Sequence, residues 1–170
     1  MVEELRLESN SAEKLIEKYN GMVYRLALSH IGNKTDAEDV MQEVFMRFVR
    51  RKPHFNDHEH EKAWFLRTTI NAAKSFRSSL WRRNAVLMPA SEINAKSTDD
   101  YSDFTKISCA VFKLDSKKRT CIHLFYYEDF SVAKIAEITG FNESTVRSHL
   151  KRAREKLKQM LGDEVFRDEE

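Results

Sequence analysis

Apolar residues recur every three or four positions along most of this chain, which is the period of an amphipathic α-helix. Near the C-terminus, Val146, Leu150, Ala153 and Leu157 follow this spacing and form one continuous stripe. The same pattern predicts helices along nearly the whole chain. The expected helices cover residues 11–31, 35–52, 61–83, 104–113, 116–127, 132–139 and 143–161.

Turn and capping residues predict where several of these helices begin and end. Thr35-Asp36-Ala37-Glu38 has the form of a capping box, and the helix that it opens stops at Pro53. Gly140 supplies a turn residue that tolerates a positive φ, and Asn142 is placed as the N-cap of the last helix. Residues 132–161 therefore predict a helix-turn-helix. The apolar residues expected to be buried in the second helix are Val40, Val44, Phe45, Phe48 and Val49.

The composition is typical of a mostly helical, soluble protein. The 170 residues are 41% hydrophobic and 33% charged, with only four Gly and two Pro. No apolar run approaches the roughly 20 residues that span a bilayer, and the acidic N-terminus lacks the features of a signal peptide. Cys109 and Cys121 match no metal spacing and are expected to be free thiols. We expect a cytoplasmic protein with no membrane insertion.

The helical pattern breaks between residues 84 and 103. This segment contains Pro89 and several Ser, Thr and Asn residues, and it carries four acids and one Lys between Glu92 and Asp103. A linker between two bundles explains this composition, and a packed loop of a single domain is the alternative. The predicted fold class is all-α, with two small helical bundles joined by a flexible linker. The predicted parts are a first domain 8–84, a linker 85–103, a second domain 104–162 and an acidic tail 163–170.

The last helix carries a basic stripe beside its apolar one. Arg147, Lys151, Arg154 and Lys158 recur at helical spacing, with Ser148 and Arg152 next to them. A basic second helix of a helix-turn-helix suits the DNA major groove, where its first residues reach base edges and its cations reach phosphates. A structural helical hairpin with a solvated face is the alternative interpretation.

The third helix predicts a second nucleic-acid surface. From Lys62 to Arg83 there are six Lys or Arg and no acid. Cations, an amide and an aromatic ring on one face suit a single strand with unstacked bases. A solvated face with the Trp packed in the core is the alternative. The residues on this face are Trp64, Arg67, Asn71, Lys74, Ser78 and Arg82, and those opposite are Leu66, Ile70, Ala73 and Leu80.

The second helix carries an acidic face made of Asp36, Asp39 and Glu43, with Gln42 and Met46 alongside. Acids in a first turn complement the helix dipole. Glu43 lies too far along the helix to benefit from the dipole. Its repulsion with Asp39, four residues earlier, destabilises the helix by about 0.2–0.5 kcal/mol. Both a protein-binding surface and a plain solvated face fit this pattern.

Catalytic and metal motifs are lacking. His58 and His60 in the polar segment 54–60 are too close together to chelate easily, and no third ligand is evident. There is no Gly-rich phosphate loop and no nucleophile elbow. We therefore expect no metal, no cofactor, no small-molecule substrate and no enzymatic activity.

Three segments, in order, resemble the bacterial RNA polymerase sigma factors of the extracytoplasmic-function (ECF) group. Asp36-Ala-Glu-Asp-Val-Met-Gln-Glu-Val-Phe45 is similar to the family's region 2.2. Ala63-Trp-Phe-Leu-Arg-Thr-Thr-Ile-Asn-Ala-Ala-Lys74 resembles regions 2.3 and 2.4, and residues 114–157 resemble region 4. Two positions depart from the family pattern, because Asp115 stands where Pro is usual and His149 where Arg is frequent.

The resemblance implies a promoter-specific transcription initiation factor that binds core RNA polymerase and promoter DNA and helps to open the duplex. An anti-sigma partner is also implied. The acidic residues implied to bind the polymerase β′ clamp are Asp36, Asp39, Gln42 and Glu43. Residues implied to hold the melted −10 strand are Trp64, Arg67, Asn71, Lys74 and Arg77, with His58 and His60 in the base-capture segment. Residues implied to read the −35 element are Arg147, Ser148, His149, Lys151 and Arg152. Two interpretations stay open for the apolar residues around Ile122, Leu124 and Phe125, a contact with the β flap or, for most of them, simply the core.

Two other functions remain open at this point. A two-domain helix-turn-helix regulator would bind duplex DNA without binding core polymerase, and a helical adaptor would bind protein alone. A regulator has no need for the acidic face or for the Trp64 and Asn71 stripe, so the first bundle discriminates between these functions.

Overall fold

The computed structural model describes the backbone of residues 2–85 and 106–162 and the side chains of residues 11–80 and 106–162. The chain divides into two compact units, Met1–Ile93 and Asn94–Glu170. All elements within the described ranges are helical, which confirms the predicted all-α class with two bundles. The predicted linker, beyond Ala85, and the acidic tail lie outside the described residues.

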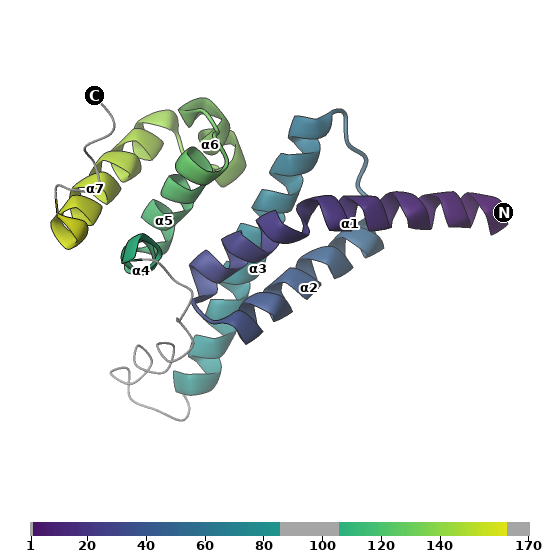
Figure 1. Ribbon diagram of the computed structural model, residues 1–170, viewed down its shortest axis with the longest axis horizontal. Helices are drawn as coiled ribbons and strands as arrows, with labels where there is room; N and C mark the ends of the chain where they lie inside the picture. Colours follow the sequence, from purple (N-terminus) through teal and green to yellow (C-terminus); the bar gives the residue numbers. More distant parts are fainter. Residues whose placement is uncertain (1, 86–105, 163–170) are drawn as a thin grey trace. The chain divides into compact units, whose positions relative to one another are not determined.

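The first unit is a bundle of three helices (Figure 1). These are α1 (Val2–Ile31), α2 (Lys34–Arg51) and α3 (His58–Ala85), and each packs against the other two. Helices α1 and α2 run antiparallel, joined by a tight turn at Gly32 and Asn33. The core lies between the apolar stripes that the periodicity predicted. Its most buried side chains are Val23, Leu26, Val40, Val44, Phe65 and Leu66.

Three boundaries in the first unit differ from the predictions. Helix α1 begins at Val2 rather than after Ser11, because the Glu- and Leu-rich start is itself a good helix former. The N-cap of α2 is Asn33 and not Thr35, since the Asn33 side chain accepts a hydrogen bond from the Asp36 N–H at 2.9 Å. The predicted polar loop ends three residues early, because the Asp57 carboxylate accepts from the His60 N–H at 2.7 Å and starts α3 at His58.

The second unit contains α4 (Lys106–Phe112), α5 (Ser116–Ile122), α6 (Val132–Thr139) and α7 (Glu143–Leu161). A single segment of π-helix, η1 (His123–Tyr127), continues α5, so the predicted helix 116–127 changes its winding after Ile122. The Asp115 side chain accepts from the Lys118 N–H and caps α5. This cap explains how the chain tolerates Asp at the position where the family usually has Pro.

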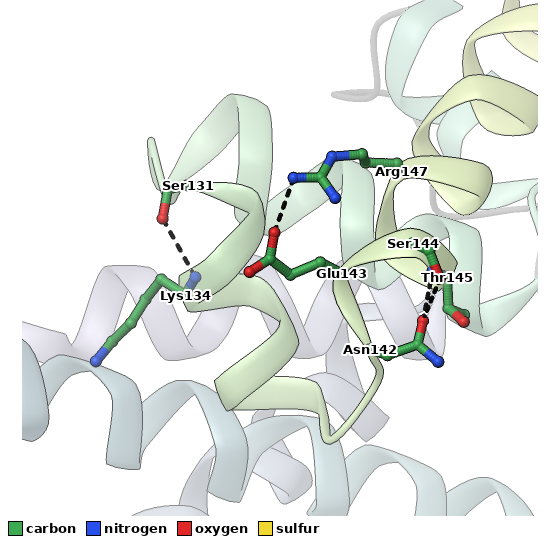
Figure 2. A network of polar contacts seen from close by, with 7 residues as sticks. All are labelled: Ser131, Lys134, Asn142, Glu143, Ser144, Thr145 and Arg147. Carbon is green, nitrogen blue, oxygen red and sulfur yellow. Dashed lines mark hydrogen bonds and ion pairs between the residues drawn. The ribbon is translucent and has the colours of Figure 1, made fainter.

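The predicted helix-turn-helix is confirmed residue by residue. Gly140 follows α6 with a φ of 76°, and its N–H donates to the carbonyl of Ala136. The Asn142 side chain accepts from the Thr145 N–H at 2.8 Å and opens α7 (Figure 2). The stripe of Val146, Leu150, Ala153 and Leu157 is buried as expected.

Candidate nucleic-acid and protein interfaces

Helix α7 presents its basic residues to solvent. Arg147, Ser148, Lys151 and Arg152 are all exposed, and the buried stripe occupies the other side of the helix. His149 differs, because it is half-buried and lies on the border between the two sides. Four of the five residues expected to read duplex DNA therefore share one accessible surface.

Arg147 is held in an ion pair within its own helix. Its guanidinium donates to the Glu143 carboxylate at 2.8 Å, and both side chains are largely exposed (Figure 2). Exposed pairs at this spacing contribute only about 0.3–0.5 kcal/mol. Little free energy therefore holds the Arg147 guanidinium on Glu143.

His149 lies against the turn and near the start of α5. Its ring packs on Phe141 at 5.4 Å between centroids. The pKa of His149 is lowered by partial burial and by the charges of Lys118, Lys117 and Arg152, while Asp115 opposes this shift. No local pattern in the sequence indicates this environment, because the start of α5 is more than 30 residues away along the chain.

Helix α3 separates its polar and apolar sides as predicted. Arg67, Asn71 and Lys74 are exposed along one side, whereas Leu66, Ile70 and Ala73 are buried on the other. The side chain of Arg82, at the end of the predicted stripe, lies outside the described side chains. The exposed side combines two cations with an amide that can both donate and accept hydrogen bonds.

Trp64 belongs to an aromatic cluster and is only half-buried. Its ring meets Phe65 edge-on at 5.1 Å and Phe48 and Phe55 at 6.0 Å each. Trp64 therefore packs against the aromatic core residues and keeps part of its side chain accessible to solvent. Phe55 anchors the segment before α3 to this cluster, a role that the sequence analysis did not assign.

Arg77 has a structural contact besides its predicted role. Its guanidinium donates to the backbone carbonyl of His30 at 3.2 Å, although its side chain is exposed. This carbonyl lies at the C-terminal end of α1, where backbone acceptors are left over. Arg77 therefore ties α3 to α1 and keeps further donors for another partner.

His58 and His60 stand on the first turn of α3 and are exposed. The Nδ1 atom of His60 accepts a hydrogen bond from the Asn56 N–H at 3.3 Å, which orders the segment before the helix. The His58 ring lies 6.3 Å from the ring of Tyr19. The two histidines therefore shape and flank the predicted base-capture segment.

Glu61 fixes the same end of α3 to α1. Its carboxylate accepts from the Tyr19 hydroxyl at 2.6 Å and from the Lys18 ammonium at 2.7 Å. Burial alone would raise the pKa of Glu61, but these hydrogen bonds and the Lys18 charge lower it overall. Burial and the hydrogen bond to Glu61 raise the pKa of Tyr19.

The outer face of α2 mixes acids with exposed apolar side chains. Asp39, Gln42 and Glu43 are exposed. Asp36 is half-buried, and its carboxylate accepts a hydrogen bond from the Asn33 amide. Glu43 pairs with Arg47 at 2.7 Å. We call the exposed set Asp39, Gln42, Glu43, Met46 and Val49 the α2 face.

Val49 corrects one prediction of burial. Met46 and Val49 are 47% and 49% exposed, so Val49 is not part of the core. It follows the buried Phe48 by one residue, which turns it about 100° away from the core side of α2. Met46 and Val49 therefore add accessible apolar surface to the same helix that exposes Asp39 and Glu43.

No group of side chains in the described part of the chain is arranged to hold a metal ion. No helix among the described residues is long and apolar enough to cross a membrane.

Two family models match the two units separately. Sigma-70 region 2 matches residues 15–83, and Sigma-70 region 4 matches residues 104–157. The RNA polymerase sigma factor SigV of Bacillus subtilis is 31% identical over 130 residues, covering 76% of this chain and 78% of SigV. The ECF RNA polymerase sigma factor BldN of Streptomyces coelicolor is 27% identical over 166 residues, which cover 93% of this chain and 63% of BldN. The chain belongs to the ECF sigma factors.

The solved structures of sigma factors confirm the fold. The sigma factor RpoE of Bartonella quintana, solved in complex with the anti-sigma factor NepR, has a TM-score of 0.73 and 22% identity, with 89% of this chain and 97% of that chain covered. In the chain described above, region 2 corresponds to α1–α3 and region 4 to α4–α7.

Burial decides between the two interpretations of the apolar residues near the end of α5. Ile122 and Leu124 are 3% and 0% exposed, so they belong to the core and cannot present a contact for the β flap. Phe125 is half-buried, and Tyr126 and Tyr127 beside it are exposed. The accessible aromatic surface of this segment therefore begins at Phe125.

Proposed function

We propose that this sigma factor uses three separate surfaces: the α2 face for core RNA polymerase, the exposed side of α3 for the melted −10 strand, and α7 for the −35 duplex. The observation that carries the proposal is the distribution of charge over these helices. Acidic and apolar residues are exposed on α2, whereas basic residues are exposed on α3 and α7. Each exposed side is backed by a buried stripe, so each surface is fixed on a packed helix.

The α2 face suits a protein partner with basic side chains, which is the role assigned to the β′ clamp. Met46 and Val49 add apolar area to bury, while Asp39 and Glu43 supply charge that steers and orients the partner. Asp36 is half-buried and contacts Asn33, so we assign it to positioning the start of α2 as well as to the interface.

The exposed side of α3 suits an opened strand. Arg67 and Lys74 are placed to contact phosphates, and Asn71 is placed to hydrogen-bond an unpaired base edge. Holding a base out of the stack costs a few kcal/mol, so a prearranged pocket helps. Phe55, His60 and the accessible edge of Trp64 order the segment that would receive this base.

Helix α7 suits the major groove of intact duplex. Asn142 and Gly140 fix its first turn, Arg147 and Ser148 project from the second turn, and Lys151 projects from the third. Residues at the start of a recognition helix reach base edges, and cations further along reach phosphates.

An anti-sigma factor is the expected regulator. The Bartonella sigma factor of the same fold was solved in complex with one. An inhibitor that covers the α2 face would block polymerase binding without touching DNA. We assign the protein to the cytoplasm, where core polymerase and promoters are, and we assign it no catalytic step of its own.

Run-off transcription with reconstituted holoenzyme tests these assignments. Asp39→Arg with Glu43→Arg should abolish core binding while the fold survives, because the charge of the α2 face is reversed. Glu17→Arg, an exposed reversal on α1, is the matched control and should bind core normally. Retained core binding in the double variant would refute the α2 assignment.

The reciprocal variant tests α7. Arg147→Ala with Lys151→Ala should weaken promoter binding by 10-fold or more, since each lost base or phosphate contact costs about 1 kcal/mol or more. Core binding should be unchanged. Equal loss of both activities would mean that these residues act through the fold rather than through DNA.

A further inference from the structure

The first two cations of α7 have different surroundings. The Arg147 guanidinium donates to the Glu143 carboxylate at 2.8 Å, and Figure 2 shows the two side chains meeting across one turn of the helix. Lys151, the next cation of the same stripe, makes no ion pair with any residue that the structure describes. One cation of the exposed side is therefore held by a carboxylate, and the next is not.

An acid at this place opposes DNA binding. Glu143 is the first residue of α7, and its side chain is 48% exposed beside that of Arg147 at 62%. Phosphates repel a carboxylate on the surface that faces them. The helix dipole favours an acid in a first turn, and an exposed pair at this spacing adds a little helix stability. Both effects are independent of DNA, so they define the alternative, purely structural role of Glu143.

We propose that Glu143 determines specificity by positioning Arg147: it directs the guanidinium to base edges and away from phosphates, so that α7 reads a guanine in the −35 duplex. This inference rests on the proposed contact between α7 and that duplex. Glu143 contacts Arg147 and acts through it, so it is a positioning residue.

The direction of the ion pair supports this role. Because Glu143 precedes Arg147 by four residues, the pair draws the guanidinium toward the N-terminal end of α7. In a helix-turn-helix this end reaches the base edges. Only one nitrogen of Arg147, Nη2, donates to Glu143, and a guanidinium has five N–H groups in all. Enough donors remain for a bidentate contact with O6 and N7 of guanine.

The ion pair gains strength when α7 lies in the groove. In water little free energy holds it, because both side chains are exposed. Between the helix and the bases water is excluded, and the lower effective dielectric strengthens the same contact. The pair of guanidinium and carboxylate has no net charge, so it gains less from a phosphate than a cation such as Lys151 does. Arg147 is therefore directed to guanine, and Lys151 to phosphate.

The experiment uses holoenzyme reconstituted from full-length protein and core polymerase, which first selects duplexes from a random pool. The base pair read by Arg147 is the one whose preference Arg147→Ala removes. The wild type should favour a G·C pair there by about 10-fold or more, the range for a bidentate contact. Glu143→Gln keeps the side-chain length and removes the charge. It should lower this preference to about threefold or less, while affinity for unselected duplex is equal or higher.

Glu155 provides the control, because it is an exposed acid of the same helix and makes no ion pair with any described residue. Glu155→Gln should leave the guanine preference unchanged. Salt titration gives a second readout. In Glu143→Gln the released Arg147 should reach a phosphate, so the logarithm of the affinity for unselected duplex should fall more steeply with the logarithm of the salt concentration, by up to about 0.9 in slope.

Several outcomes would overturn the positioning role and leave the −35 assignment intact. These are a wild-type preference for another base pair at the position of Arg147, an unchanged guanine preference in Glu143→Gln, and an equal loss of affinity for all duplexes in that variant. An effect of Glu143→Gln on base preference in the Arg147→Ala background would do the same, because no guanidinium remains to be positioned. If Arg147→Ala with Lys151→Ala bound the selected duplex as tightly as the wild type, the −35 assignment and this inference would both fail.

Discussion

At the scale of single residues, Glu61 shows how one carboxylate positions a functional surface. It joins the first turn of α3 to Tyr19 and Lys18 of α1, and its side chain is only 15% exposed. The loop that precedes α3 and the accessible edge of Trp64 depend on where this turn lies. Glu61 therefore positions the proposed base-capture segment without belonging to it.

Glu61→Gln should lower the free energy of unfolding by about 1–3 kcal/mol at pH 7, the range for a lost hydrogen bond to a charged group. The folded pKa of Glu61 lies below its ordinary value of 4.5. Its contribution is therefore present above that value and is lost as the pH falls through the folded pKa. Urea denaturation followed by Trp fluorescence from pH 3 to pH 7 measures this, because both Trp residues lie in the first unit.

Exposed Glu17 provides the control for this titration. Glu17→Gln should change neither the stability at pH 7 nor its dependence on pH. If Glu61→Gln showed the same acid dependence as the wild type, the two hydrogen bonds would not be the source of the effect.

At the scale of elements, the recognition helix depends on its first turn. Helix α6 has eight residues and α7 has 19, and Gly140 and Asn142 set the angle between them. The Ser144 hydroxyl also donates to the Asn142 side chain at 2.7 Å, so one amide oxygen organises the whole turn (Figure 2). The residues proposed to reach base edges begin at Arg147, five positions after Asn142.

Asn142→Ala should destabilise the second unit by about 1 kcal/mol, since an N-cap side chain is lost and a backbone donor of α7 goes unpaired. Asn142→Asp keeps the acceptor and should retain most of the stability. Hydrogen exchange of the amides of residues 143–147 gives the local readout. Equal protection in the Ala variant and the wild type would show that packing alone fixes this turn.

At the scale of the whole molecule, the two units have separate cores. Leu26 is fully buried in the first unit and Leu150 is 2% exposed in the second. This arrangement fits a factor whose two DNA-binding surfaces are proposed to hold separate promoter elements, because each surface is supported by its own bundle.

Leu26→Ala should destabilise the first unit by about 2–5 kcal/mol through the cavity that it leaves, and Leu150→Ala should do the same to the second. Each change should leave the other unit unaffected, because the two residues lie in separate cores with no shared packing partners. Trp fluorescence reports on the first unit, and hydrogen exchange of α7 reports on the second. A shift of both units by either variant would contradict independent cores.

The sequence by itself determined the helical class, the helix-turn-helix and, apart from residues such as Val49, the side of each long helix that faces water. These features are local, because residues three or four positions apart share a helix face whatever the rest of the chain does. Gly140, Asn142 and the stripe from Val146 to Leu157 were predicted for this reason. The three motifs were also enough to identify the family, because their order along the chain is a property of the sequence alone.

Only the tertiary structure decided which side chains from distant segments meet. Nothing near Arg77 in the sequence indicates its bond to His30, and nothing near His149 indicates the lysines at the start of α5. The half-buried state of Trp64 likewise depends on Phe48 and Phe55 packing against it. Charge, burial and hydrogen bonding at a site are sums over neighbours in space, and helical periodicity specifies a face without specifying what packs against it.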